Sequence, residues 1–181
     1  MKKLNIKILL TALLSIVGAR GLAYDIEVAN EDGVTIYYNY IFEGKELAVT
    51  YRVGSYKYSG KVVIPEEVAY QGRTRKVTSI GEGAFRNCIS LTSVTIPNTV
   101  TSIGSNAFYS CEGLTNITIP NFVKTIGHFA FYNCSGLTSV TIGNSVTSIG
   151  YEAFYYCSRL MSVTIPNSVT DIGNYAFEEC I

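Results

Sequence analysis

A 23-residue internal repeat fills the second half of this 181-residue chain and restricts the folds open to it. One unit reads L-x-x-[VI]-T-I-[PG]-N-x-V-x-x-I-G-x-x-A-F-x-x-C-x-x. Its most regular elements are an Ala-Phe pair and a cysteine, which recur as Ala84-Phe85, Ala107-Phe108, Ala130-Phe131, Ala153-Phe154 and Ala176-Phe177, and as Cys88, Cys111, Cys134, Cys157 and Cys180. A fixed period of this length indicates a solenoid, in which each unit forms one coil and stacked coils share a core.

The spacing inside one unit predicts the path of a coil. Residues 94–96 alternate apolar and polar side chains, which is typical of a strand with one inward face, and Pro97 ends that strand because it has no N–H to donate. Gly104 permits a tight bend, and residues 107–111 place Ala, Phe and Cys on one face of a single helical turn. Stacked coils would set Phe over Phe at about 4.8 Å, the spacing of neighbouring strands. We therefore expect a parallel strand ladder with short helical turns.

The string I-P-x-x-V-x-x-I-G-x-x-A-F-x-x-C resembles the leucine-rich repeat of treponemal proteins and of BspA-like surface proteins. The likeness covers residues 77–181 in full and 61–76 loosely. It implies a leucine-rich-repeat-type solenoid and attachment to host matrix proteins or to other cells. BspA-like repeats are also accompanied by a lead-in segment before the first coil.

The residues before the repeats form two further predicted regions. Residues 24–60 do not repeat, and hairpin-like turns at 31–33 and 43–45 border two alternating runs, 34–42 and 46–53. We interpret 24–60 as a small antiparallel β-cap, because a bare end coil would expose an unpaired apolar edge. Residues 61–181 are then the solenoid, with a degenerate first repeat at 61–88 that carries about nine extra residues.

The first 23 residues have the pattern of a secretory signal peptide. Lys2, Lys3 and Lys7 precede an apolar run at 8–17, and Gly21-Leu22-Ala23 offers a cleavage site after Ala23. A membrane anchor is the alternative, but the run is shorter than the roughly 20 residues that span a bilayer. We expect a secreted or cell-surface protein with no membrane span after cleavage. Since cleavage would remove four basic and no acidic residues from a balance of 14 and 14, nucleic acid is not an expected partner.

The chain stops at Ile181, two residues before the next leucine of the repeat is due. Two interpretations stay open. Either this is a truncated form of a longer repeat protein, or the open C-terminal edge pairs with a partner, including a second copy of the chain.

The residues that could carry chemistry do not assemble into a recognisable site. The five cysteines share one inward slot, where the ladder spacing exceeds the roughly 3.8 Å between the Cβ atoms of a disulfide, so we interpret them as small core residues. The only histidine, His128, could neighbour Ser105, but no third group or oxyanion site is visible. We expect no catalytic, metal or cofactor site, and a protein that is not an enzyme.

Two repeated surfaces are candidates for binding a protein ligand. The first is a field of hydroxyl and amide side chains on the strand face, although threonine also simply suits a solvated strand. The second is an aromatic strip, which could instead be partly packed against neighbouring coils, and which comprises Tyr109, Phe129, Tyr132, Tyr151, Tyr155, Tyr156 and Tyr175. Exposed tyrosine is enriched at interfaces, so we favour the strip as the contact surface of an adhesion module. A structural spacer that associates through its C-terminal edge is the alternative.

Overall fold

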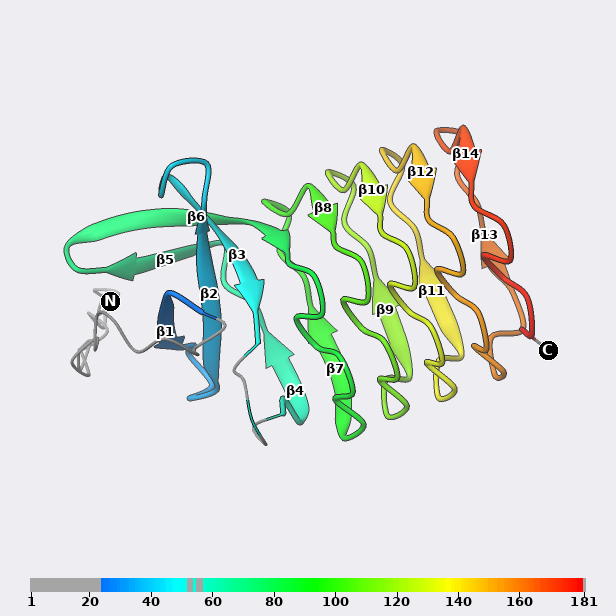
Figure 1. The fold of residues 1–181 in the computed structure, drawn as a ribbon, viewed down its shortest axis with the longest axis horizontal. Helices are drawn as coiled ribbons and strands as arrows, with labels where there is room; N and C mark the ends of the chain where they lie inside the picture. The colour runs from blue at the N-terminus through cyan, green and yellow to red at the C-terminus, as the bar shows by residue number, and fades with distance from the viewer. Residues whose placement is uncertain (1–23, 52–53, 55–56, 181) are drawn as a thin grey trace, which may run out of the picture.

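The computed structural model describes residues 24–51, 54 and 57–180, and the predicted signal peptide lies outside these residues. Within this part the chain forms fourteen β-strands and no helix. Figure 1 shows the coils stacked side by side along one axis, with the N-terminal strands at one end of the stack. The predicted parallel ladder preceded by antiparallel strands is confirmed.

Each repeat contributes two strands, and both kinds stack in parallel. The first strands, of two to five residues, are β7 (Leu91–Thr95), β9 (Asn116–Thr118), β11 (Ser139–Thr141) and β13 (Val163–Thr164). The second, short strands have two residues each and are β8 (Ser102–Ile103), β10 (Thr125–Ile126), β12 (Ser148–Ile149) and β14 (Asp171–Ile172). The short strands pair in register, so that Ile126 lies beside Ile103 on one side and Ile149 on the other. A 23-residue period therefore returns each side chain to the same slot.

The third side of each coil is a turn segment, and here the helical prediction is wrong. These five turn segments are residues 82–87, 105–110, 128–133, 151–156 and 174–179. In the second of them the N–H of Ala107 donates to Gly104 within the coil, but the N–H of Phe108 donates to Ala130 of the next coil at 2.7 Å. Asn106 and Ser110 have φ values of 56° and 52°, which interrupt any helix. Alternate N–H groups thus extend a third ladder between coils.

The repeat glycine also has a different role from the predicted bend. Gly104 does not take a left-handed conformation. A Cβ added to it would lie 2.8 Å from the backbone nitrogen of Glu82, and one added to Gly127 would lie 2.5 Å from that of Ser105. The glycine is required because the backbones of successive coils approach too closely for a side chain.

The core is a column of stacked rings, as the period predicts. Phe108 and Phe131 lie 5.0 Å apart between ring centroids, with planes 4° from parallel, and Phe85, Phe154 and Phe177 continue the column at 4.9 to 5.1 Å. The cysteines flank it as free thiols, and Cys111 donates from Sγ to the carbonyl of Phe85 at 3.0 Å. Burial raises the pKa of Cys134 to about 12.

The N-terminal strands are β1 (Ile26–Ala29), β2 (Thr35–Ile41) and β3 (Glu46–Thr50), and they form an antiparallel meander. The two predicted runs correspond to β2 and β3. The predicted turns lie between the strands: the N–H of Gly33 donates to Asn30 between β1 and β2, and that of Gly44 donates to Ile41 between β2 and β3. These strands continue directly into the ladder, because β3 pairs in parallel with β6 (Arg73–Ile80).

The region predicted to be a degenerate first repeat, residues 61–88, completes the junction. There β4 (Gly60–Val63) pairs in parallel with β7, and β5 (Glu67–Tyr70) forms a hairpin with β6 that accounts for the extra residues. Tyr58 packs its ring between Phe85, at 4.7 Å, and Tyr37, at 6.0 Å. Its hydroxyl accepts from the N–H of Tyr37 and donates to the carbonyl of Thr50, both at 3.0 Å. Tyr58 therefore joins the meander to the phenylalanine column.

Candidate functional site

The turn segments carry the aromatic residues that the repeat predicts. The residue after each core phenylalanine points away from the column, and in three successive coils it is a tyrosine. Tyr109 and Tyr132 stack at 4.8 Å with planes 3° apart, and Tyr132 and Tyr155 stack at 5.3 Å with planes 10° apart. The coil spacing thus builds a second, outer column of rings that runs alongside the buried one.

The remaining four aromatic residues join this outer column. Phe129 lies 6.0 Å from Tyr132 and 5.4 Å from Tyr151, in edge-to-face contacts. Tyr151 in turn contacts Tyr175 edge-to-face at 5.8 Å, and Tyr156 lies 5.5 Å from Tyr155. All seven predicted residues are therefore connected by ring contacts into one set, which we call the aromatic surface.

Three residues of the aromatic surface occupy backbone positions that aromatic side chains rarely take. Phe129, Tyr156 and Tyr175 have φ values of 56°, 61° and 60°. Some equivalent positions of other coils hold the more tolerant Gly83, Asn87, Asn106 and Asn133, whereas others hold Ser110, Glu152 and Glu179 in the same conformation. Tyr156 and Tyr175 are 48% and 55% exposed. These side chains cost conformational energy and contribute little to the core, so packing alone does not account for them.

Carboxylates surround the C-terminal part of the aromatic surface. A hydrogen bond to Glu152 raises the pKa of Tyr151 to about 12, with desolvation and the charge of Glu152 acting in the same direction. Desolvation in the ring stack, followed by the charges of Glu178 and Glu179, raises the pKa of Tyr155. The hydroxyls of Tyr151 and Tyr155 therefore stay protonated at neutral pH, beside carboxylates that make their surroundings negative.

Arg86 ends the outer column at its N-terminal side, a contact that the sequence analysis did not predict. It occupies the slot of Tyr109 one coil earlier, and its guanidinium carbon lies 4.9 Å from the centre of the Tyr109 ring. The 23-residue period alone shows that Arg86 is equivalent to Tyr109. The stacking follows only from the geometry, because the long side chain must lie along the coil axis to reach the next ring.

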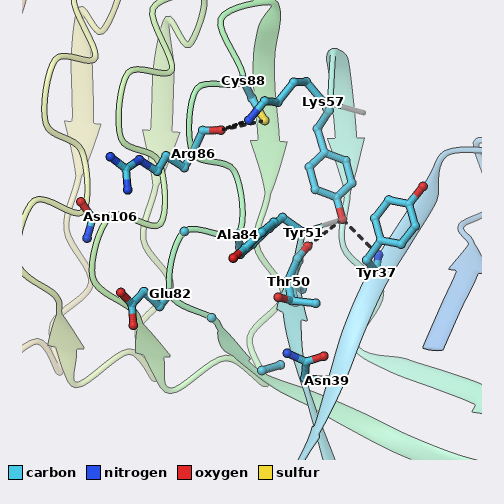
Figure 2. Close-up of a pocket in the computed structure, with 15 residues that line it drawn as sticks. Tyr37, Asn39, Thr50, Tyr51, Lys57, Glu82, Ala84, Arg86, Cys88 and Asn106 are labelled. Carbon is cyan, nitrogen blue, oxygen red and sulfur yellow. Dashed lines mark hydrogen bonds between the residues drawn. The ribbon is translucent and has the colours of Figure 1, made fainter. Parts of the chain in front are cut away.

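Beside Arg86 the structure contains a pocket of about 550 Å³ between the meander and the first coil. Figure 2 shows Glu82, Arg86 and Asn106 on the coil side of this pocket, and Tyr37 and Asn39 on the strand side. Lys57 donates from Nζ to the carbonyl of Arg86 at 3.0 Å. No repeat pattern could reveal this pocket, because its walls come from two regions that the period does not relate.

The only histidine has a structural contact. Nδ1 of His128 accepts a hydrogen bond from the backbone N–H of Tyr151 in the next coil, at 2.9 Å. On the strand face, the threonine hydroxyls are surface groups, and that of Thr138 donates to the carbonyl of Thr115 at 3.0 Å. The residues that the structure describes include no group of three or more His, Cys, Asp or Glu side chains that could hold a metal ion.

The stacked coils, the ring columns and the repeated outer surface define a solenoid of the leucine-rich repeat class. The BspA type leucine rich repeat region matches residues 71–181 in six copies. The chain belongs to this family.

Solved structures agree with the assignment. A T. pallidum leucine-rich repeat protein is 32% identical over 80% of this chain and 64% of its own, with a TM-score of 0.71. A leucine-rich repeat protein from Bacteroides ovatus is 38% identical over 85% of this chain and 38% of its own, with a TM-score of 0.75. A leucine-rich cell surface protein from Faecalibacterium prausnitzii is 30% identical over 86% of this chain and 52% of its own, with a TM-score of 0.57.

This chain therefore spans less than two thirds of the length of each of these three proteins. The comparison with curated proteins gives no match. Among the described residues there is no helix of the length and apolar character needed to cross a membrane.

Proposed function

We propose that this chain is the binding module of an exported cell-surface or secreted protein, and that it contacts a protein ligand through the aromatic surface. The connected set of seven rings on the outside of the solenoid carries the proposal. Tyrosine offers a large contact area with few rotatable bonds, so an interface loses little entropy when these side chains are fixed. A column fixed by the coil spacing is also preorganised, which lowers the cost of binding.

The proposed location rests on two supports. Residues 1–23 have the pattern of a cleaved signal peptide. The similar protein from Faecalibacterium prausnitzii is described as a cell surface protein. We further propose that residues 24–60 act as an N-terminal cap on a solenoid at 61–181, whose first repeat at 61–88 is degenerate. A host matrix or cell-surface protein is the proposed partner class, from the resemblance to BspA-like proteins.

Binding of residues 24–181 to purified extracellular-matrix proteins tests this function. We expect saturable binding that the double substitution Tyr132→Ala, Tyr155→Ala abolishes, with a thermal unfolding transition that stays cooperative. The matched control is Tyr40→Ala, a half-buried tyrosine of β2 outside the aromatic surface. Equal binding by the wild-type chain and the double variant would reject the aromatic surface as the contact site.

A structural spacer that associates through its last coil is the alternative function. Sedimentation of residues 24–181 over a range of concentrations separates the two. A monomer that binds a matrix protein supports the binding module, whereas reversible stacks whose formation does not depend on Tyr132 support the spacer.

A further inference from the structure

The faces of the outer tyrosine column are not open to a flat ligand. Tyr132 is stacked on both sides, by Tyr109 at 4.8 Å and by Tyr155 at 5.3 Å. The guanidinium of Arg86 covers the outer face of Tyr109. A sugar ring or a planar aromatic ligand therefore cannot stack on the middle of the column. In the middle of the column a partner can contact only the edges of the rings. Accessible ring faces lie towards Tyr151, Tyr156 and Tyr175, where the contacts between rings are tilted or edge-to-face.

The turn segments become net negative towards the C-terminal end of the stack. The first turn segment holds Glu82 together with Arg86, the only lysine or arginine in the five segments, so its charges balance. The last two turn segments hold Glu152, Glu178 and Glu179 without any basic residue. Glu152 acts on the neighbouring Tyr151 hydroxyl and raises its pKa. The accessible ring faces and the carboxylates thus lie together at one end of the aromatic surface.

Both features favour the same kind of partner group. An aromatic face is the negative region of the ring quadrupole and attracts a cation placed within about 6 Å of its centre. Neighbouring carboxylates add a Coulombic attraction of the same sign. The chain already makes this contact internally, since Arg86 lies 4.9 Å from the Tyr109 ring at the opposite end of the column.

We infer that the partner is a basic protein segment, whose arginine or lysine side chains lie against Tyr151, Tyr156 and Tyr175 between the carboxylates of Glu152 and Glu178. This inference rests on the proposed function and adds the chemistry of the partner to it. At the acidic end of the outer column, the partner's cation would repeat the contact that Arg86 makes with Tyr109 at the N-terminal end. Complementary charge also speeds encounter, so binding depends on ionic strength.

The test measures binding of residues 24–181 to a short labelled peptide in which arginine alternates with glycine and serine. A peptide with glutamine in place of each arginine is the comparison. We expect the arginine peptide to bind about tenfold more tightly than the glutamine peptide. Raising NaCl from about 50 to about 500 mM, which shortens the Debye length roughly threefold, should remove most of this difference.

Substitutions locate the contact. Glu152→Gln combined with Glu178→Gln should weaken binding of the arginine peptide several-fold. Glu31→Gln combined with Glu67→Gln changes the net charge equally at exposed sites near the N-terminal strands, and should leave binding unchanged. Equal affinity for the two peptides, equal effects of the two double variants, or no binding of the arginine peptide would each overturn the inference.

The outcome is distinguishable from failure of the proposed function. Binding of a matrix protein that needs Tyr132 and Tyr155 but that the arginine peptide does not compete would leave the aromatic surface as the site and reject the basic partner. If the arginine peptide competes with the matrix protein for the wild-type chain but not for the Glu152→Gln, Glu178→Gln variant, the result would support both the proposed function and the basic partner.

Discussion

At the scale of single residues, the thiols of the four buried repeat cysteines, Cys88, Cys111, Cys134 and Cys157, are neutral donors inside the stack. Cys111 and Cys134 donate from Sγ to carbonyls of the preceding coil, at 3.0 and 3.1 Å. Burial raises the pKa of Cys88 to about 11 and that of Cys134 to about 12, whereas an unfolded thiol ionises near about 8.5. The folded state therefore requires the protonated form.

This requirement predicts loss of stability at alkaline pH. Below about pH 8.5 both states hold the proton and the stabilisation is complete; as the pH rises towards the folded pKa values, only the unfolded chain releases protons, so the free energy of unfolding falls. Urea unfolding at about pH 7.5 and about pH 10 measures the change. Cys134→Ala should lose less stability between these pH values than the wild type. An equal loss in the two proteins would show that Cys134 does not contribute.

Tyr156 presents a conflict between backbone conformation and surface chemistry at one residue. Its φ of 61° is disfavoured by about 1–2 kcal/mol for most side chains but is tolerated by asparagine. Tyr156→Asn should relieve this strain and lose a ring contact worth roughly 0.5–1.5 kcal/mol, so we expect stability within about 1 kcal/mol of the wild type. Binding of the partner should nevertheless weaken.

The control for Tyr156→Asn is Tyr109→Asn, which lacks the compensating gain because Tyr109 has an ordinary φ. Its ring is also stacked against Tyr132 and Arg86, so this variant should be the less stable of the two. Urea unfolding of both variants, together with affinity for the arginine peptide, checks the expectation. A Tyr156→Asn protein less stable than Tyr109→Asn would contradict it.

At the scale of the coil, the buried phenylalanine column contributes most to stacking. Phe131 is fully buried and lies between Phe108 and Phe154, at 5.0 and 4.9 Å. Phe131→Ala should lower the free energy of unfolding by roughly 3–5 kcal/mol, because neighbouring coils are held by three backbone ladders and cannot collapse into the cavity. Chemical denaturation measures this loss. Tyr132→Ala, one residue further on, removes a ring of similar size and should cost clearly less, since it opens no cavity in the core.

The coil also shows how far the sequence determines the fold. The period fixed the strands, the inward slots and the phenylalanine stacking, because identical spacing must return identical contacts. The helical turn was wrong because Ala, Phe and Cys at residues 107–111 satisfy the helical spacing, while the backbone at Asn106 and Ser110 is left-handed. Asparagine at positions 87, 106 and 133 was the available signal, since it tolerates this conformation. The aromatic surface was predictable as a row, but its ring angles were not.

At the scale of the whole molecule, a column of aromatic rings connects the meander to the solenoid. The ring of Tyr24 lies 4.7 Å from that of Tyr37, which in turn contacts Tyr58. Tyr58 contacts Phe85, the first ring of the buried column. The repeat could not predict the role of Tyr58, because this residue lies outside the period and its two neighbours are distant in the chain. In a solenoid each unit contacts only its neighbours, so a defect at this junction should stay local.

Tyr58→Ala tests this locality. The change removes a buried ring and the hydroxyl that bonds to Tyr37 and Thr50, at a cost of roughly 3–5 kcal/mol. We expect hydrogen exchange to show lost amide protection in β1 and β2, while β10 and β12 stay close to wild-type protection. Phe131→Ala is the reciprocal case and should lower protection in β10 and β12 more than in β2. If Tyr58→Ala deprotected β12 as strongly as β2, the molecule would unfold as one cooperative unit, and the aromatic surface would then depend on the meander for its rigidity.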